Sequence, residues 1–150
     1  MRIYLLLSSL MLVSTSYAKP PATTVMQPTI VNLAGAPERQ VPSGKARVKM
    51  LAQGQKAFVG QLWLAPEARV PVHRDTSEEY IFIVSGAGEM TINGQTSQVG
   101  PGTMVFMPAN AEVSFKNGPE PLRALQIFAG PESAAKYAKW QASTPGVEAP

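Results

Sequence analysis

The chain contains no cysteine and only one histidine among its 150 residues. Without cysteine, no disulfide can stabilise the fold, so its stability must depend on a hydrophobic core. Because His73 is the one imidazole, any histidine-dependent chemistry of this protein must use that residue.

The apolar run near the start is too short to cross a bilayer. Residues 3–13 form a mainly apolar run, residues 1–2 provide a positive start, and residues 16–18 provide a small-residue cleavage site. This pattern is typical of a secretory signal peptide, not of a membrane span. We therefore expect cleavage after Ala18 and a periplasmic or secreted mature protein without a membrane span. Since no cysteine follows the cleavage point, we expect no lipid anchor.

Strong charge of one sign is also missing. The 13 Lys and Arg residues against 10 Asp and Glu give a net charge of +3, and the basic residues are spread thinly along the chain. No basic run is interleaved with aromatic residues, which argues against nucleic-acid binding. Residues 45–49 alternate basic and apolar side chains, as a solvated strand does.

The remaining sequence is long enough for one domain with a real core. After the signal peptide, residues 19–44 are rich in proline and predict a flexible or extended segment, in which Ile30–Leu33 could add an edge strand. Residues 45–130 predict a barrel, and residues 131–150 a short C-terminal helix and a frayed tail.

Short apolar segments separated by glycine and proline dominate the barrel region. They predict an all-β fold, an antiparallel sandwich or small barrel. The expected strands are Val48–Leu51, Ala57–Leu64, Glu79–Val84, Glu89–Ile92, Thr96–Val99, Met104–Met107, Val113–Lys116 and Arg123–Phe128. Asn93-Gly94 is a strong hairpin signal between two of them. Pro131 suits a first helical turn, and Ala134, Tyr137 and Trp140 fall on the side of the helix expected to pack against the barrel.

Three candidate metal ligands lie close together in the sequence. Residues two apart on a strand face the same way, so His73 and Asp75 are expected to point together. Glu79 follows after a short turn and can bring its carboxylate opposite them. Imidazole and carboxylate groups are competent ligands for divalent transition metals.

These residues resemble the two sequence motifs of the cupin superfamily. The first motif runs histidine, any residue, histidine, three or four residues, glutamate, six residues, glycine; its four places hold His73, Asp75, Glu79 and Gly86. The second runs glycine, five residues, proline, any residue, glycine, two residues, histidine, three residues, asparagine; its five places hold Gly102, Pro108, Asn110, Val113 and Asn117. The resemblance covers roughly residues 48–128. It implies a single cupin-type antiparallel β-barrel, a double-stranded β-helix or jelly roll, of a small bacterial type, and a possible homodimer.

The departures from the motifs bear on function. Metal-binding cupins usually supply three histidines and one glutamate, and here Asp75 and Val113 replace two of the histidines. The leading glycine of the first motif is replaced by Glu67. Since valine cannot ligate a metal, the usual four-ligand site cannot form.

Two classes of function follow. We favour a degenerate site in which the barrel binds a small organic ligand, such as a sugar or an aromatic acid. Val113, Phe115 and Gln126 would then line the pocket, Asp75 would pair with Arg69 or Arg123, and Glu79 would hold a backbone or hydroxyl donor. The alternative is a metal-dependent oxygenase, decarboxylase or isomerase that binds manganese, iron or zinc through His73, Asp75 and Glu79. Metal-free acid–base chemistry with His73 as the base lies between the two.

Overall fold

The computed structural model describes residues 27–143. The predicted signal peptide, residues 19–26 of the predicted N-terminal segment and residues 144–150 of the predicted tail lie outside the described residues.

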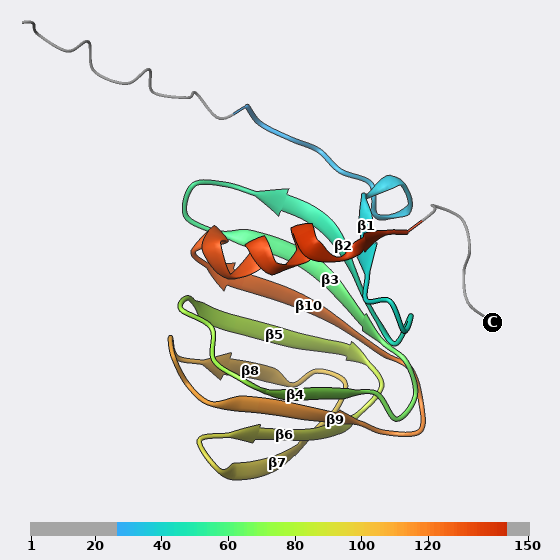
Figure 1. Cartoon of the computed structure of the whole chain (residues 1–150), viewed down its shortest axis with the longest axis vertical. Coiled ribbons are helices and arrows are strands. Elements are labelled where there is room, and N and C mark those ends of the chain that lie inside the picture. The colour runs from blue at the N-terminus through green and yellow to red at the C-terminus, as the bar shows by residue number, and fades with distance from the viewer. Residues whose placement is uncertain (1–26, 144–150) are drawn as a thin grey trace, which may run out of the picture.

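Two antiparallel sheets face each other (Figure 1). The larger sheet has the strand order β11-β1-β2-β3-β10-β5-β8. Its strands are β1 (Glu38–Gln40), β2 (Ala46–Gln53), β3 (Phe58–Leu64), β5 (Glu78–Ser85), β8 (Met104–Met107), β10 (Leu122–Ala129) and β11 (Gln141–Ala142). The smaller sheet, in the order β4-β9-β6-β7, contains β4 (Arg69–His73), β6 (Gly88–Ile92), β7 (Gln95–Val99) and β9 (Val113–Asn117). Within residues 27–143 no strand pairing joins the two sheets, so this jelly roll is not a closed barrel.

Each of the eight predicted strands overlaps an observed strand. The structure adds β1, β4 and β11, which are short or, in β4, interrupted by Pro71. The suggested edge strand over Ile30–Leu33 is wrong, because a 3₁₀ helix, η1 (Leu33–Gly35), begins there. The Asn32 side chain accepts a hydrogen bond from the Ala34 amide and so caps η1 in place of a strand ladder.

Alternating burial along the strands places the core between the sheets. In β5, Glu79, Ile81 and Ile83 are buried while Glu78, Phe82 and Val84 are exposed, as expected for a strand with one face inward. Hydrophobic residues from both sheets form the main core cluster, which includes Leu64, Ile83, Met107 and Leu122.

Two turns carry non-glycine residues where the cupin motifs have glycine. Glu67 has a φ of 57° and Asn110 a φ of 62°, both in the left-handed region that glycine favours. The predicted hairpin turn between β6 and β7 is present, with positive φ at both Asn93 and Gly94.

The predicted C-terminal helix is the 3₁₀ helix η2 (Pro131–Lys139). It ends before Gln141, because Gln141 and Ala142 join the sheet as β11. As expected, Ala134, Tyr137 and Trp140 pack against the body of the protein, where Phe58 and Phe128 complete a second core cluster. Helix η2 lies across the larger sheet at one end of the cavity described below (Figure 1).

Candidate functional site

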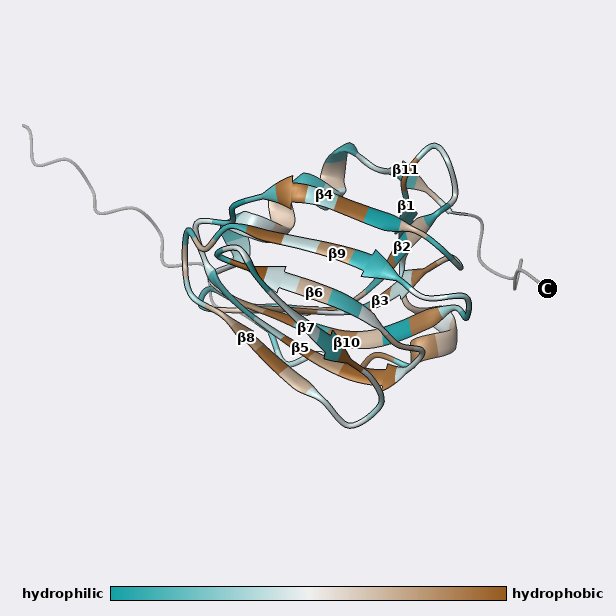
Figure 2. Cartoon of the chain, turned by 90° about the horizontal axis from the view of Figure 1, so that it is seen from below, coloured by the Kyte–Doolittle hydropathy of each residue, from teal (hydrophilic) through white to brown (hydrophobic). Residues whose placement is uncertain are grey.

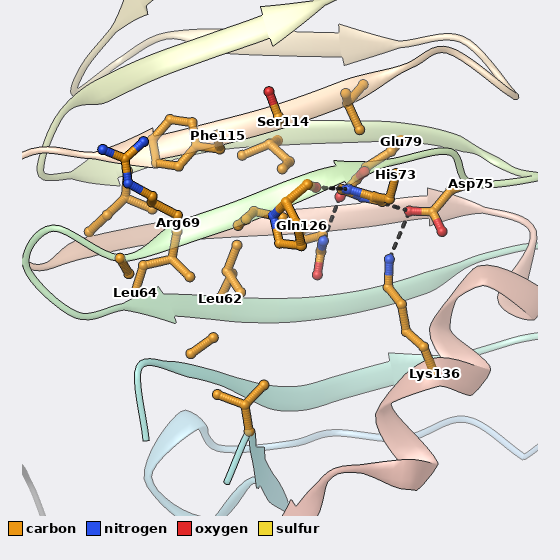
Figure 3. Close-up of a pocket in the computed structure, with 18 of the residues that line it drawn as sticks. Leu62, Leu64, Arg69, His73, Asp75, Glu79, Ser114, Phe115, Gln126 and Lys136 are labelled. Atoms are coloured by element: carbon orange, nitrogen blue, oxygen red, sulfur yellow. Dashed lines mark hydrogen bonds and ion pairs between the residues drawn. The ribbon is translucent and has the colours of Figure 1, made fainter. Parts of the chain in front are cut away.

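A cavity of about 550 Å³ lies between the two sheets. Most of its lining is aliphatic or aromatic and comes from inward-facing strand positions, among them Leu62, Leu64, Ile81, Met90 and Phe115. Figure 3 shows a connected group of polar side chains at one end of this space, beside η2, while Arg69 and Ser114 lie apart from it. We call this group the polar end; it consists of His73, Asp75, Glu79, Gln126, Lys136 and Tyr137.

Asp75 stands between two basic groups. Its Oδ2 atom accepts a hydrogen bond from Lys136 Nζ at 2.7 Å and lies 3.6 Å from His73 Nε2. The latter distance is too long for a good hydrogen bond but suits an ion pair. His73 Nδ1 lies 2.9 Å from the Pro71 carbonyl oxygen, which can only accept, so Nδ1 carries a proton.

The buried half of the polar end is a chain of hydrogen bonds. Tyr137 OH donates to Gln126 Oε1 at 2.6 Å, and Gln126 Nε2 donates to Glu79 Oε1. All three residues are at most 4% exposed. Since the Gln126 amide satisfies both neighbours, this chain fixes the direction in which Glu79 presents its second oxygen.

Burial and charge shift the acid–base properties of the polar end. The Asp75 carboxylate raises the pKa of His73 above its usual range, against the effect of partial burial. Burial alone would raise the pKa of Asp75, but its interactions with His73 and Lys136 outweigh burial and lower that pKa. For Glu79, burial dominates over the hydrogen bond from Gln126 and raises the pKa. Burial also raises the pKa of Tyr137.

Residues 62–128 match the cupin domain family. This segment contains both motifs, strands β4 to β9 and most of β10. A cupin of known structure from Shewanella frigidimarina, described as RmlC-like, superposes with a TM-score of 0.63 at 15% identity, covering 69% of this chain and 92% of that one. The protein has a cupin fold.

Two curated relatives are similar to part of this chain. A protein of Streptomyces coelicolor described as uncharacterized is 39% identical over 56 residues, which are 37% of this chain and 53% of that protein. This chain therefore spans about half the length of that relative. The dimethylsulfoniopropionate lyase DddW of Ruegeria pomeroyi is 29% identical over 105 residues, 67% of this chain and 69% of that protein.

The structure brings the predicted site residues to one cavity. His73, Asp75 and Glu79 lie at its polar end, and Val113, Phe115 and Gln126 also line it. The expected partners were wrong, however. Asp75 pairs with Lys136, not with Arg69 or Arg123, and Glu79 accepts from a side-chain amide, not from a backbone or hydroxyl group.

Lys136 and Tyr137 were missed by sequence reasoning. Both lie on η2, and Lys136 is 61 residues away from Asp75 in the chain. Alternation along strands says nothing about a helix that folds back over the cavity. The one available signal was the predicted packing of Tyr137, which places its neighbour Lys136 near the same surface.

As arranged, the residues do not fit a metal ion. Within residues 27–143, no three His, Asp or Glu side chains are grouped so that they could hold one. Lys136 occupies Asp75 Oδ2, Gln126 occupies Glu79 Oε1, and Val113 stands where the second motif has histidine. The three-ligand metal site stays a prediction.

The arrangement can bind and orient a polar head group. His73 Nε2, Asp75 and the second Glu79 oxygen offer hydrogen-bonding atoms of both kinds, and the apolar lining excludes water from the rest of a bound molecule. The His73–Asp75 pair can also hold a proton close to such a head group.

In the part of the chain that the structure describes, no helix is long and apolar enough to span a membrane.

Proposed function

We propose that this cupin binds a small, mainly apolar organic molecule with one polar head group. The observation that carries the proposal is the cavity itself: about 550 Å³ of space with a mostly apolar lining and a hydrogen-bonded group of polar side chains at one end. Such a volume is typical of small-molecule sites, in which apolar lining provides affinity and a few polar groups fix orientation. Of the ligands that the sequence suggested, an aromatic acid suits this lining better than a sugar, whose hydroxyl groups would lack partners.

Thermal shift tests the proposal with cinnamate and glucose as probes. Cinnamate is expected to raise the melting temperature and glucose is not, since a ligand that binds only the folded state stabilises it by mass action. Val113→Trp, which fills the cavity, is expected to abolish the shift. Val72→Trp is the matched control, because Val72 is 66% exposed. A shift that survives in Val113→Trp would contradict binding in the cavity, and no shift with cinnamate or any related acid would contradict the ligand class.

The alternative is an enzyme that acts on a molecule held in the same cavity. Its support is the similarity to a dimethylsulfoniopropionate lyase together with the His73–Asp75 pair at the polar end. His73 would then transfer a proton, or His73, Asp75 and Glu79 would rearrange to bind a metal. The metal content of tag-free protein separates these two versions, because the metal version requires near-stoichiometric metal that disappears in Asp75→Ala.

Export of the protein is proposed from the sequence of residues 1–18 alone. The mature chain is expected to begin at Lys19 in a periplasmic or culture fraction. Sequencing its N-terminus checks this, and an intact Met1 in purified material from the native source would contradict it.

We further propose a homodimer formed by the outer face of β10, β5 and β8. Four large apolar side chains stand exposed there, at 37% to 55%: Phe82, Val84, Met104 and Phe106. The register places Phe82 between Leu125 of β10 and Met104 of β8, so these side chains form one continuous patch. Figure 2 shows the hydrophobic colouring along β5 and β8. A patch of this kind is typical of an interaction surface.

Charge favours a second copy as the partner. Glu78 and Arg123 lie at opposite ends of the patch, since Glu78 pairs with Ala129 and Arg123 with Ser85. A two-fold axis between the faces and perpendicular to the strands reverses the strand direction. It therefore brings Glu78 of one copy toward Arg123 of the other, which makes the face self-complementary.

Sedimentation velocity tests the interface by charge exchange. Glu78→Arg and Arg123→Glu are each expected to weaken the dimer at least about tenfold, and the double variant to restore it. Glu89→Arg on the smaller sheet is the control and should leave the dimer intact. Single variants that remain dimeric would place the interface elsewhere, and a monomeric wild type would contradict the dimer.

A further inference from the structure

The cavity has a second charged end, opposite the polar end. Figure 3 shows Arg69 and Leu64 on the side of the cavity away from Lys136 and η2. Lys45 belongs to the same side, because its carbonyl oxygen accepts a hydrogen bond at 2.9 Å from the amide of Ala65, which directly follows Leu64. Both Arg69 and Lys45 line the cavity. We call these two residues the cationic end.

The charges at the two ends of the cavity differ. Asp75 and Glu79 are the carboxylates that line it, and both belong to the polar end. The other Lys and Arg side chains of the lining are paired, Lys136 with Asp75 at 2.7 Å and Arg74 with Glu112 at 2.9 Å. Within residues 27–143, neither residue of the cationic end forms an ion pair with a carboxylate. Two positive charges therefore lie at this end without compensation.

Arg69 can reach the cavity because it begins the edge strand of the smaller sheet. Strand β4 pairs with β9 on one side and has no strand on the other. Val70, the next residue, lies opposite Phe115 and packs against the core, so alternation turns Arg69 away from the core at its Cβ atom. Its long side chain then lines the cavity at the free edge of β4.

The cationic end is also the cheaper place for a ligand carboxylate. Arg69 and Lys45 are exposed, so a charged group bound there keeps part of its contact with water. At the polar end, Glu79 and Gln126 are buried, and a second negative charge would be removed from water beside two carboxylates. Burying a charge without a free partner is costly.

An apolar stretch joins the two ends. It is lined by Leu64, Ile83 and Leu122, each at most 2% exposed, and by Leu62. A molecule that spans the cavity must therefore have an apolar middle part.

We propose that the ligand of this cavity carries a carboxylate opposite its polar head group, and that Arg69 and Lys45 bind this carboxylate. The inference rests on the proposed function and deepens it, because it names a second polar group of the ligand and the residues that recognise it. The polar end then takes an uncharged group such as a hydroxyl, since its cations already have carboxylate partners. A guanidinium group matches a carboxylate through two parallel hydrogen bonds, which gives Arg69 the larger part in recognition.

Calorimetry of the tag-free mature protein tests this inference, with 4-hydroxycinnamate and its methyl ester as probes. Both molecules contain the hydroxyl group, the ring and the apolar linker, but the ester lacks the negative charge. Wild type is expected to bind the acid at least about fivefold more tightly than the ester at low ionic strength. This preference should shrink in about 0.5 M salt, since exposed charges are screened.

Substitutions at the cationic end locate the carboxylate. Arg69→Gln is expected to lose most of the preference for the acid and to bind the ester as wild type does, and Lys45→Gln should lose part of it. Lys56→Gln is the matched control, because Lys56 is exposed and does not line the cavity. Lys45→Glu combined with Arg69→Glu is expected to prefer tyramine, which has an ammonium group in place of the carboxylate.

The outcomes separate this inference from the proposed function. Equal binding of the acid and the ester by wild type would overturn the inference and leave the proposed function standing. A preference for the acid that persists in Lys45→Gln combined with Arg69→Gln, with folding checked by circular dichroism, would overturn it too, since the carboxylate would then bind elsewhere. Binding of neither probe would contradict the proposed function and the inference together.

Discussion

Glu67 adopts a backbone conformation that costs energy for any residue with a Cβ atom. Its φ of 57° lies in the left-handed region, and its amide donates to the Gly118 carbonyl at 2.9 Å, so the turn before β4 cannot relax without losing that bond. The left-handed conformation costs about 1–2 kcal/mol for a residue with a Cβ atom, and glycine avoids this cost. Part of that advantage is cancelled, because glycine loses more conformational freedom than other residues when the chain folds.

Glu67→Gly is therefore expected to raise the free energy of unfolding by roughly 0.5–1 kcal/mol. Glu67→Ala keeps the Cβ atom and should bring no such gain. Urea denaturation of the three proteins provides the measurement, and equal stability of the glycine and alanine variants would contradict the argument.

Because His73 is the single histidine, its contribution to the pH dependence of the free energy of unfolding can be measured with one substitution. Because Asp75 raises the pKa of His73 in the folded state, the protonated imidazole stabilises the fold. That contribution is complete below the unfolded pKa of about 6.5 and is lost as the pH rises through the higher folded value. The stability difference between wild type and His73→Asn is thus expected to shrink as the pH rises above 6.5.

Chemical denaturation between pH 5.5 and 9 measures that difference. Asp75→Asn removes the carboxylate that raises the pKa of His73, so the same titration should be weak or absent in that background. A difference between wild type and His73→Asn that grows with rising pH would contradict the assigned charge state.

Single residues show how far the sequence can predict the site. His73, Asp75 and Glu79 do lie together at one end of the cavity, but the expectation that strand alternation aligns His73 with Asp75 was wrong, because β4 ends at His73 and Asp75 lies in the connection to β5. The hydrogen-bond partners of these residues were not predictable. Lys136 reaches Asp75 from a distant helix, and which atom of Gln126 meets Glu79 depends on side-chain rotamers that no spacing encodes.

At the scale of elements, the strands from β5 to β10 and the pair β2 and β3 were predictable, whereas β1, β4 and β11 were not. All eight expected strands are present, and most of them bury alternate residues. Strands β1 and β11 pair over two or three residues, and their sequences carry too little hydrophobic signal to be seen. Helix η2 was expected, and it ends at Lys139 because Gln141 and Ala142 pair with β1 as β11.

Strands β6 and β9 approach so closely at Gly88 that no side chain fits there. A Cβ atom on Gly88 would lie 2.5 Å from Phe115 Cζ and closer still to the Lys116 carbonyl oxygen. Gly88→Ala must therefore displace backbone, and we expect a loss of about 1–3 kcal/mol in the free energy of unfolding.

Gly35→Ala is the control, because no atom lies within 4 Å of a Cβ placed there. Thermal and urea denaturation compare the two variants. A Gly88→Ala protein as stable as the control would contradict this argument, because β6 and β9 would then accommodate the added Cβ atom without loss of stability.

At the scale of the whole molecule, the larger sheet contributes both to the cavity and to the proposed dimer interface. The inner face of β10, β5 and β8 encloses the cavity, and the outer face carries the apolar patch proposed to bind a second copy. Since association stabilises the folded state by mass action, the melting temperature is expected to rise by a few degrees over a hundredfold increase in protein concentration.

Phe106→Asp places a charge in the patch and should remove this concentration dependence. Thr96→Asp, on an exposed position of β7, is the control and should retain it. Differential scanning calorimetry at several concentrations measures the effect, and a melting temperature of wild type that does not change with concentration would contradict the proposed dimer.

The pairing of β1 with β11 also makes one part of the molecule less resistant to a pulling force than the rest. Ser143 donates its amide to the Glu38 carbonyl at 3.0 Å, so a force that separates these two residues pulls hydrogen bonds apart one at a time. Strand β11 and η2 should therefore peel away first. Optical tweezers with handles at these positions are expected to show an early lengthening of roughly 50 Å, the span of residues 130–143 when extended. A single unfolding step would contradict this order. In such an intermediate, Lys136 would have left the cavity while the two sheets remain folded under the applied force.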